Sequence, residues 1–124
     1  MLYAILCYDS EAVVGSWTKA EDDALMGRLL AVQQKVAAQG KLGPVARLMP
    51  TTAATTLRKG RETIVLDGPY AETKEALLGF YIVDRASLEE AIDFVRDLAG
   101  AATHGTGAYE IRPVYFYEPG VGVK

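Results

Sequence analysis

The sequence of 124 residues predicts one α+β domain, spanning residues 1–124, in which two helices pack on an antiparallel sheet. Two segments, Leu2–Tyr8 and Leu77–Val83, are apolar at both alternating positions, which is typical of central strands covered on both faces. Two other segments begin with a capping-box pattern and continue with apolar residues at helical spacing. A chain of this length usually forms a single core.

The first half of the chain predicts a strand followed by a long helix. Thr18 and Glu21 have the spacing of a capping box, so the helix is expected to begin there. Gly40 supplies a stop signal at the end of its apolar pattern. Gly43-Pro44 is expected to break the chain after the helix.

The middle of the chain predicts a hairpin. Thr51–Arg58 is rich in β-branched threonine and is expected to pair with Glu62–Leu66 across a turn at residues 59–61. The strand Leu77–Val83 follows, and a second helix is expected from Ser87 to Gly100. A final strand is expected over Tyr109–Tyr117.

The resulting order, β-α-β-β-β-α-β, is a ferredoxin-like arrangement with an extended central hairpin. Two helices cover only one face of such a sheet, yet its central strands are apolar on both faces. A face-to-face homodimer would bury the remaining apolar surface, so we expect a second copy to be a partner.

The composition excludes several classes of protein. A formal net charge of -3 and a pI of about 5.1 provide no basic surface for nucleic acid, so direct binding of DNA or RNA is not expected. The single cysteine, Cys7, excludes an internal disulfide and favours a cytoplasmic location. The chain shows no basic leader and no apolar run long enough to cross a membrane.

The most informative segment is the polar turn at residues 67–75, Asp-Gly-Pro-Tyr-Ala-Glu-Thr-Lys-Glu, which is followed by Leu78-Gly79-Phe80-Tyr81. This sequence motif resembles the signature of the DGPF-type branch of the YCII-related family, with Tyr70 in place of the usual phenylalanine. The resemblance extends from about Gly40 to the end of the final strand. It implies a dimeric α/β-barrel fold.

The same resemblance carries expectations about function. Relatives include cofactor-free enzymes that act on small ring compounds, and some YCII-related proteins are thought to use a histidine-aspartate pair. Their histidine lies early in the chain, whereas this sequence has no histidine before His104. Members similar to this branch often accompany extracytoplasmic-function sigma factors, which implies a sigma factor as a possible partner.

Three residues are candidates for acid/base catalysis. Asp67 ends an apolar strand, where partial burial raises a carboxyl pKa toward a useful range, although aspartate also simply forms turns. His104 is the only histidine and thus the natural proton carrier, unless it is an exposed loop residue. Asp9 follows the first strand and could supply a second carboxylate or merely end that strand.

The candidates for substrate binding lie in the polar turn and on the last strand. Arg112 would hold an anionic substrate if it points inward, or pair with a surface acid if it points outward. The turn residues could bind a polar ligand or form a solvated loop. The proposed substrate-binding residues are Tyr70, Glu72, Thr73, Lys74 and Arg112. No metal site and no cofactor are expected, because a lone histidine and cysteine offer few ligands and no Gly-rich phosphate loop is present.

Two functions follow from this sequence. The first is a cofactor-independent enzyme, lyase- or isomerase-like, that uses acid/base residues in a barrel cleft on a small molecule. It predicts one pocket that contains both Asp67 and His104 as the proton-transfer groups. The second is a non-catalytic ligand-binding or regulatory accessory protein, in which the turn at residues 67–75 contacts a partner. The sequence leaves open whether the protein catalyses a reaction.

Overall fold

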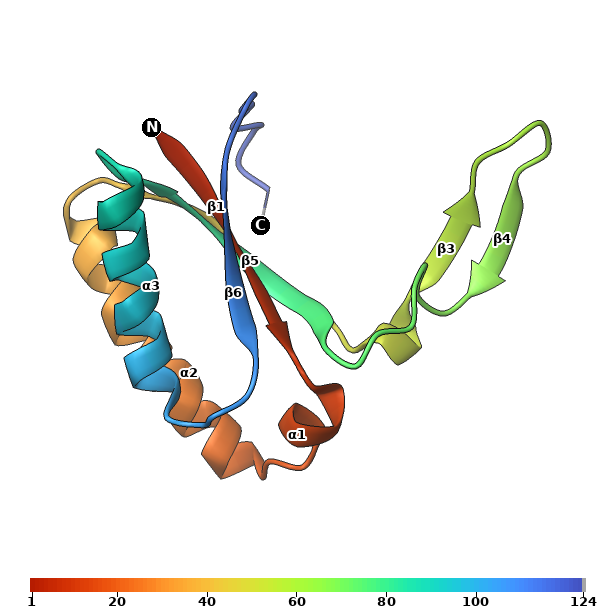
Figure 1. The fold of residues 1–124 in the computed structure, drawn as a ribbon, viewed down its shortest axis with the longest axis horizontal. Helices are drawn as coiled ribbons and strands as arrows, with labels where there is room; N and C mark the ends of the chain where they lie inside the picture. The colour runs from red at the N-terminus through yellow and green to blue at the C-terminus, as the bar shows by residue number, and fades with distance from the viewer. Residues whose placement is uncertain (124) are drawn as a thin grey trace.

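A four-stranded antiparallel sheet in the order β2-β5-β1-β6 forms the body of the protein, and a separate hairpin projects from it (Figure 1). The computed structural model describes residues 1–123. β1 (Leu2–Asp9) is central and pairs with β5 (Ala76–Asp84) on one side and β6 (Ala108–Pro113) on the other. β2 (Leu42–Arg47) pairs with the outer side of β5. This arrangement confirms the predicted ferredoxin-like α+β fold.

Helices α2 (Lys19–Ala38) and α3 (Leu88–Ala102) lie together on one face of this sheet (Figure 1). Alternate residues of the central strands point toward the helices and are buried, which follows from the period of two along a strand. The helices contribute an apolar stripe to the same core. The buried core consists of Tyr3, Ile5, Val36, Tyr81, Val83, Ala91, Phe94 and Leu98.

Both predicted helix starts are confirmed by their caps. The Thr18 hydroxyl accepts from the Glu21 amide at 3.1 Å, and the Glu21 carboxylate accepts from the Thr18 amide at 3.0 Å. The Ser87 hydroxyl accepts from the amide of Glu90 at 3.2 Å at the start of α3. Gly40, with a φ of 71°, follows the end of α2 as expected.

The predicted chain break at Gly43-Pro44 is wrong, because this dipeptide lies inside β2. β2 is an edge strand, where proline can be placed without removing a needed ladder hydrogen bond. The register shifts between Leu42 and Val45, which accommodates the proline as an irregularity. Gly43 also lies against β5, where a Cβ atom would be 3.0 Å from the Ile82 carbonyl oxygen.

The predicted threonine-rich hairpin exists, but it forms its own two-stranded sheet rather than part of the main one. β3 (Thr55–Arg58) pairs with β4 (Ile64–Asp67), and the short 3-10 turn η1 (Thr51–Ala53) precedes it. The hairpin therefore lies where the sequence predicted it along the chain. In the main sheet, however, the position beside β5 is taken by β2, a strand that was not predicted.

Two predicted boundaries differ from the structure near the C-terminus. The last strand ends at Pro113 rather than at Tyr117. Pro113 pairs with Tyr3, and the Val114 amide donates to Leu2, where the partner strand β1 begins. α3 continues past Gly100 to Ala102, and the left-handed residue Thr103, with a φ of 59°, ends it.

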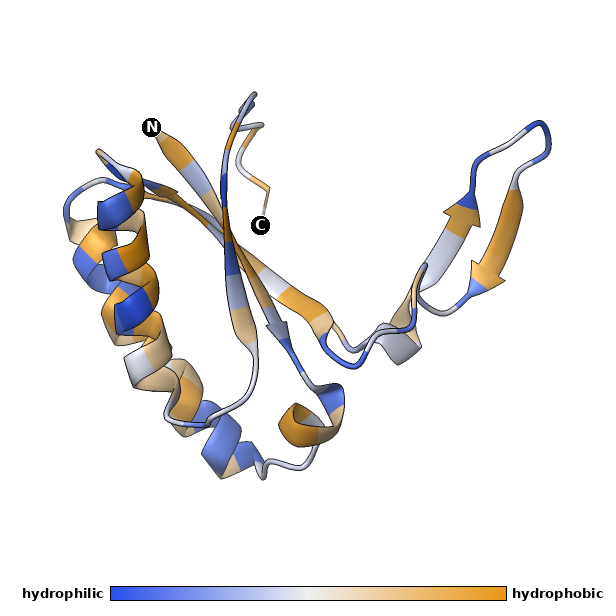
Figure 2. Cartoon of the chain, viewed as in Figure 1, coloured by the Kyte–Doolittle hydropathy of each residue, from blue (hydrophilic) through white to orange (hydrophobic). Residues whose placement is uncertain are grey.

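Within residues 1–123, both long helices lie on the same face of the sheet, and the hairpin projects away from them (Figure 1). Figure 2 shows apolar residues along β4, far from the helices. Contiguous apolar surface of this kind is typical of interaction sites. The exposed apolar side chains of the hairpin are Leu57, Ile64, Val65 and Leu66.

None of the helices in residues 1–123 combines the length and the apolar character that a membrane crossing requires.

Candidate acid/base site

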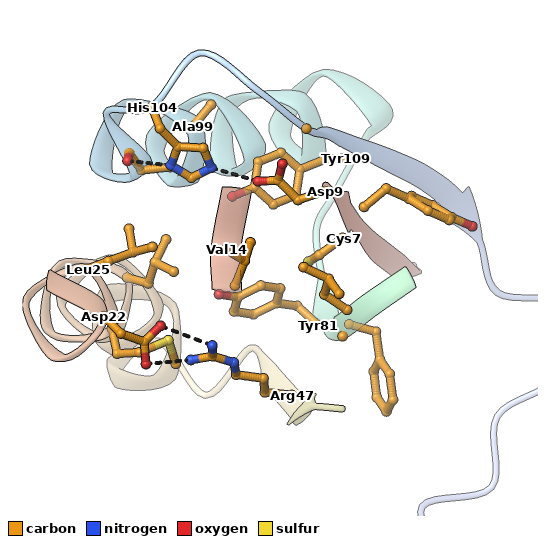
Figure 3. A pocket seen from close by; sticks show the side chains of 18 of the residues that line it. Cys7, Asp9, Val14, Asp22, Leu25, Arg47, Tyr81, Ala99, His104 and Tyr109 are labelled. Carbon is orange, nitrogen blue, oxygen red and sulfur yellow. Dashed lines mark hydrogen bonds and ion pairs between the residues drawn. The ribbon is translucent and has the colours of Figure 1, made fainter. Parts of the chain in front are cut away.

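A cavity of about 730 Å³ lies between the sheet, α2 and the loop that follows α3 (Figure 3). Its lining is largely apolar, with tyrosine and tryptophan rings among the aliphatic side chains. Such a concave apolar site with a few polar groups is the usual form of a small-molecule pocket. The apolar lining includes Val14, Leu25, Met26, Leu29, Leu30 and Tyr81.

Asp9 and His104 form a close pair on one wall of this cavity (Figure 3). His104 Nε2 lies 2.6 Å from Asp9 Oδ2. The other carboxylate oxygen, Oδ1, accepts from the Ser10 amide at 2.7 Å and from the Thr106 hydroxyl at 2.9 Å. The buried Asp9 carboxylate is therefore fully supplied with donors, as a charge removed from water requires.

The hydrogen bonds of His104 determine where its protons are. Nδ1 lies 2.9 Å from the Ala102 carbonyl oxygen, which only accepts, so Nδ1 carries a hydrogen. Nε2 faces a carboxylate oxygen, so a second proton lies between these two atoms. Burial alone would raise the pKa of Asp9, but the hydrogen bonds from His104, Thr106 and Ser10 outweigh it and lower that pKa. The Asp9 carboxylate is therefore the acceptor in this contact, and Nε2 of His104 is the donor.

The loop after α3 is shaped to bring His104 to the end of β1. Thr103 takes a left-handed conformation directly after the helix and turns the chain toward Asp9. Gly107 has a φ of 92°, and a Cβ atom there would lie 2.7 Å from the Tyr8 carbonyl oxygen. Only glycine allows the loop to pass so close to β1.

Trp17 packs against the imidazole from the link between α1 (Glu11–Gly15) and α2. The two ring centroids are 4.9 Å apart at an interplanar angle of 68°, an edge-on arrangement. Ser10 begins α1 by accepting from the Val13 amide at 3.3 Å, so the residue after Asp9 also fixes the direction of this helix.

A second charged pair lies on the other side of the cavity from His104 and Asp9 (Figure 3). Both terminal nitrogens of Arg47, the last residue of β2, donate to the Asp22 carboxylate of α2, each at 3.0 Å. This fork-like geometry fixes the plane of the guanidinium.

Three further titratable side chains of the cavity remain neutral. Burial raises the pKa of the Cys7 thiol to about 12 and that of the Tyr81 hydroxyl to about 12, and it raises the pKa of Tyr109 as well. Cys7 is therefore not a thiolate nucleophile.

Comparison with known families matches residues 1–117 to the YCII-related domain. The chain belongs to the YCII-related family. It is also 61% identical over 121 residues to an uncharacterised protein of Rhizobium meliloti (strain 1021), and the match covers 97% of each chain.

In this YCII-related domain, two of the three candidate acid/base residues come together and the third does not. Asp9 and His104 are in contact although 95 positions separate them in the sequence. Asp67 is exposed at the end of β4, opposite Thr55 in the hairpin, and does not line the cavity. The expected pocket with both Asp67 and His104 is therefore not formed within one subunit, because β4 belongs to the separate hairpin.

The candidate substrate-binding residues also lie outside the cavity of the subunit. The turn residues Glu72, Thr73 and Lys74 are exposed, and the exposed Tyr70 ring lies 5.3 Å from the Arg58 guanidinium carbon. Arg112 follows Ile111, which packs on the core, so it points to the opposite face of the sheet. Arg112 is exposed there and does not line the cavity.

Arg47, Asp22 and Trp17 were not predicted to be site residues. Arg47 follows the dipeptide that favours a chain break, so nothing indicated that it sits on a strand beside a cavity. Trp17 is the only tryptophan of the chain and directly precedes a helix cap, and this is the one sequence feature that could have marked it as a site residue. In residues 1–123, no three histidine, cysteine, aspartate or glutamate side chains cluster as they would around a metal ion.

We expect Asp9→Asn to destabilise the protein at neutral pH by about 1 to 3 kcal/mol, because it removes a charged acceptor from a buried network. The folded pKa of Asp9 lies below its ordinary value of 3.8, so the ionised carboxylate contributes stability above that value. This contribution is lost as the pH falls through the folded pKa. The stability difference between wild type and variant should therefore narrow in acid, which urea denaturation across this range measures.

Asp93→Asn is the matched control, because Asp93 is an exposed acid that pairs with Arg96 on the surface. It should leave the free energy of unfolding nearly unchanged. A difference for Asp9→Asn that stays constant down to the lowest pH at which the protein folds would contradict the ionised pair.

Proposed function

We propose that this YCII-related protein is a cofactor-independent enzyme, lyase- or isomerase-like, that moves a proton on a small molecule bound in the cavity. The observation that supports this most directly is the 2.6 Å contact between His104 Nε2 and Asp9 Oδ2 in the wall of a largely apolar cavity. An acid and a base side by side are the groups that proton transfer requires.

The chemistry follows from the protonation of the pair. A ligand that binds against the two side chains meets the Asp9 carboxylate as a proton acceptor and the His104 Nε2–H as a proton donor. Asp9 removes a proton from a C–H or O–H group, while His104 protonates a developing oxyanion or a leaving group. The proton then returns from Asp9 to Nε2, which restores the starting state.

The apolar lining strengthens both roles. Charges interact more strongly where water is excluded, and donors already held in place need no reorganisation during the reaction. Thr106 and Ser10 hold the carboxylate, and the Ala102 carbonyl holds the imidazole, so both groups are oriented before a ligand binds.

Deuterium exchange tests this function for any carbon acid, whatever its product. Small carbon acids that quench Trp17 fluorescence are incubated with the protein in heavy water, and NMR follows the loss of their C–H signals. We expect exchange with the wild-type protein, and a rate at least about 100-fold lower for His104→Gln and Asp9→Asn. Asp93→Asn should exchange at the wild-type rate.

Equal exchange rates for wild type and His104→Gln would contradict the proposed enzyme. So would a set of bound carbon acids of which none exchanges. That second result would favour a ligand-binding or regulatory accessory protein, the alternative supported by the exposed turn at residues 67–75. In that role the turn would contact a protein such as an extracytoplasmic-function sigma factor.

We also propose that the active form is a cytoplasmic homodimer. The reduced cytoplasm would keep the free Cys7 thiol intact. A second copy would cover the open face of the sheet and the hairpin, whose Ile64 and Val65 side chains are more than half exposed in one subunit. A hairpin of two strands is only marginally stable alone in water, so a partner would stabilise it.

Sedimentation at micromolar concentration tests the assembly. We expect a species of twice the 13.4 kDa subunit mass. Val65→Lys on the hairpin should shift this species toward the monomer, whereas Lys59→Ala in the adjacent turn should not. A wild-type protein that sediments only as a monomer would contradict the homodimer.

A further inference from the structure

The Arg47–Asp22 pair gives the cavity a second polar end. In Figure 3 it lies across the cavity from His104 and Asp9, with Leu25, Val14 and Tyr81 between the two pairs. A bound molecule that reaches from one pair to the other therefore has an apolar body and a polar group at each end.

The hydrogen bonds of Arg47 indicate what kind of group fits there. A guanidinium has five N–H donors, and among the hydrogen bonds of residues 1–123 Arg47 uses only two, both to Asp22. Nε–H and one hydrogen on each terminal nitrogen remain for another acceptor. The side chain is about half exposed (46%), so a ligand can approach it.

Both acids of the cavity already have a hydrogen-bond donor as a partner. Asp22 accepts from Arg47, and Asp9 accepts from His104. Each Asp22 oxygen already accepts from Arg47. A cationic ligand would have to displace the arginine, whereas an acceptor only fills donors that Arg47 has not used.

We propose that the substrate of this site is a small carboxylate with an apolar, ring-sized body. Its carboxylate binds the free donors of Arg47, and its reactive end lies against His104 and Asp9. Arg47 is the residue that determines specificity, and Asp22 occupies two of its N–H groups without contributing a contact to the ligand. The inference rests on the proposed function for the reactive end, while the carboxylate contact stands on Arg47 alone.

Three probes of one shape test the preference: phenylacetate, 2-phenylacetamide and phenethylamine carry an anion, a neutral amide and a cation on the same body. Trp17 is the only tryptophan and lines the cavity, so its fluorescence reports binding directly. We expect phenylacetate to bind about tenfold more tightly than the amide, because hydrogen bonds between charged groups are the stronger ones, and phenethylamine to bind most weakly.

Arg47→Gln keeps the approximate length of the side chain and removes its charge. It should bring phenylacetate down to the affinity of the amide and leave the amide unchanged. Asp22→Asn breaks the same ion pair but keeps the positive charge, so it should retain or increase the preference for phenylacetate. A purely structural ion pair would instead make both variants lose stability with no change in the ratio between the probes.

The proposal is overturned if the amide binds wild-type protein as tightly as phenylacetate, if none of the three probes binds, or if Arg47→Gln keeps the preference. The wild-type comparison decides the matter even if that variant does not fold. His104→Gln separates this inference from the proposed function, since it should abolish deuterium exchange while phenylacetate still binds.

Discussion

The buried carboxylate of Asp9 is the constraint on which the site depends. β1 lies between β5 and β6, so the residue at its end is largely removed from water, and a charge there must be paired. Its partners come from the residue that caps α1 and from the loop after α3. The hydrogen bonds that this one carboxylate needs therefore connect the end of β1 to the loop after α3.

The same requirement explains the local backbone. Thr103 adopts a left-handed conformation to direct His104 toward β1, and Gly107 lets the loop pass against Tyr8 without a clash. Trp17 then packs on the imidazole and lines the cavity. On the other side Arg47 joins the edge strand to α2, so each end of the cavity is formed by a charged contact between elements distant in sequence.

Local patterns predicted the elements well, because caps and periodicity are local. Thr18 with Glu21, and Ser87, mark helix starts that the structure confirms, and the two strands apolar on both faces are indeed central. The prediction failed at Gly43-Pro44, since an edge strand tolerates proline and a sequence does not reveal which strand is at the edge.

The site was only partly predictable. Asp9 and His104 were both candidates, but contact between them depends on the pairing of β1 with β6 and on the course of the last loop, which no local pattern encodes. The pattern of the polar turn instead favoured Asp67 as the partner of His104, and Arg47 was missed because its strand was not predicted.

The proposed chemistry depends on one proton shared between His104 and Asp9, so that an imidazolium faces a carboxylate. Nitrogen-15 NMR of the single histidine tests this most directly, because the chemical shift of each ring nitrogen reports whether that atom carries a hydrogen. We predict that both nitrogens are protonated at neutral pH in the wild-type protein and that Asp9→Asn leaves only one protonated. A neutral imidazole with one bare nitrogen in the wild-type protein would contradict the imidazolium–carboxylate pair.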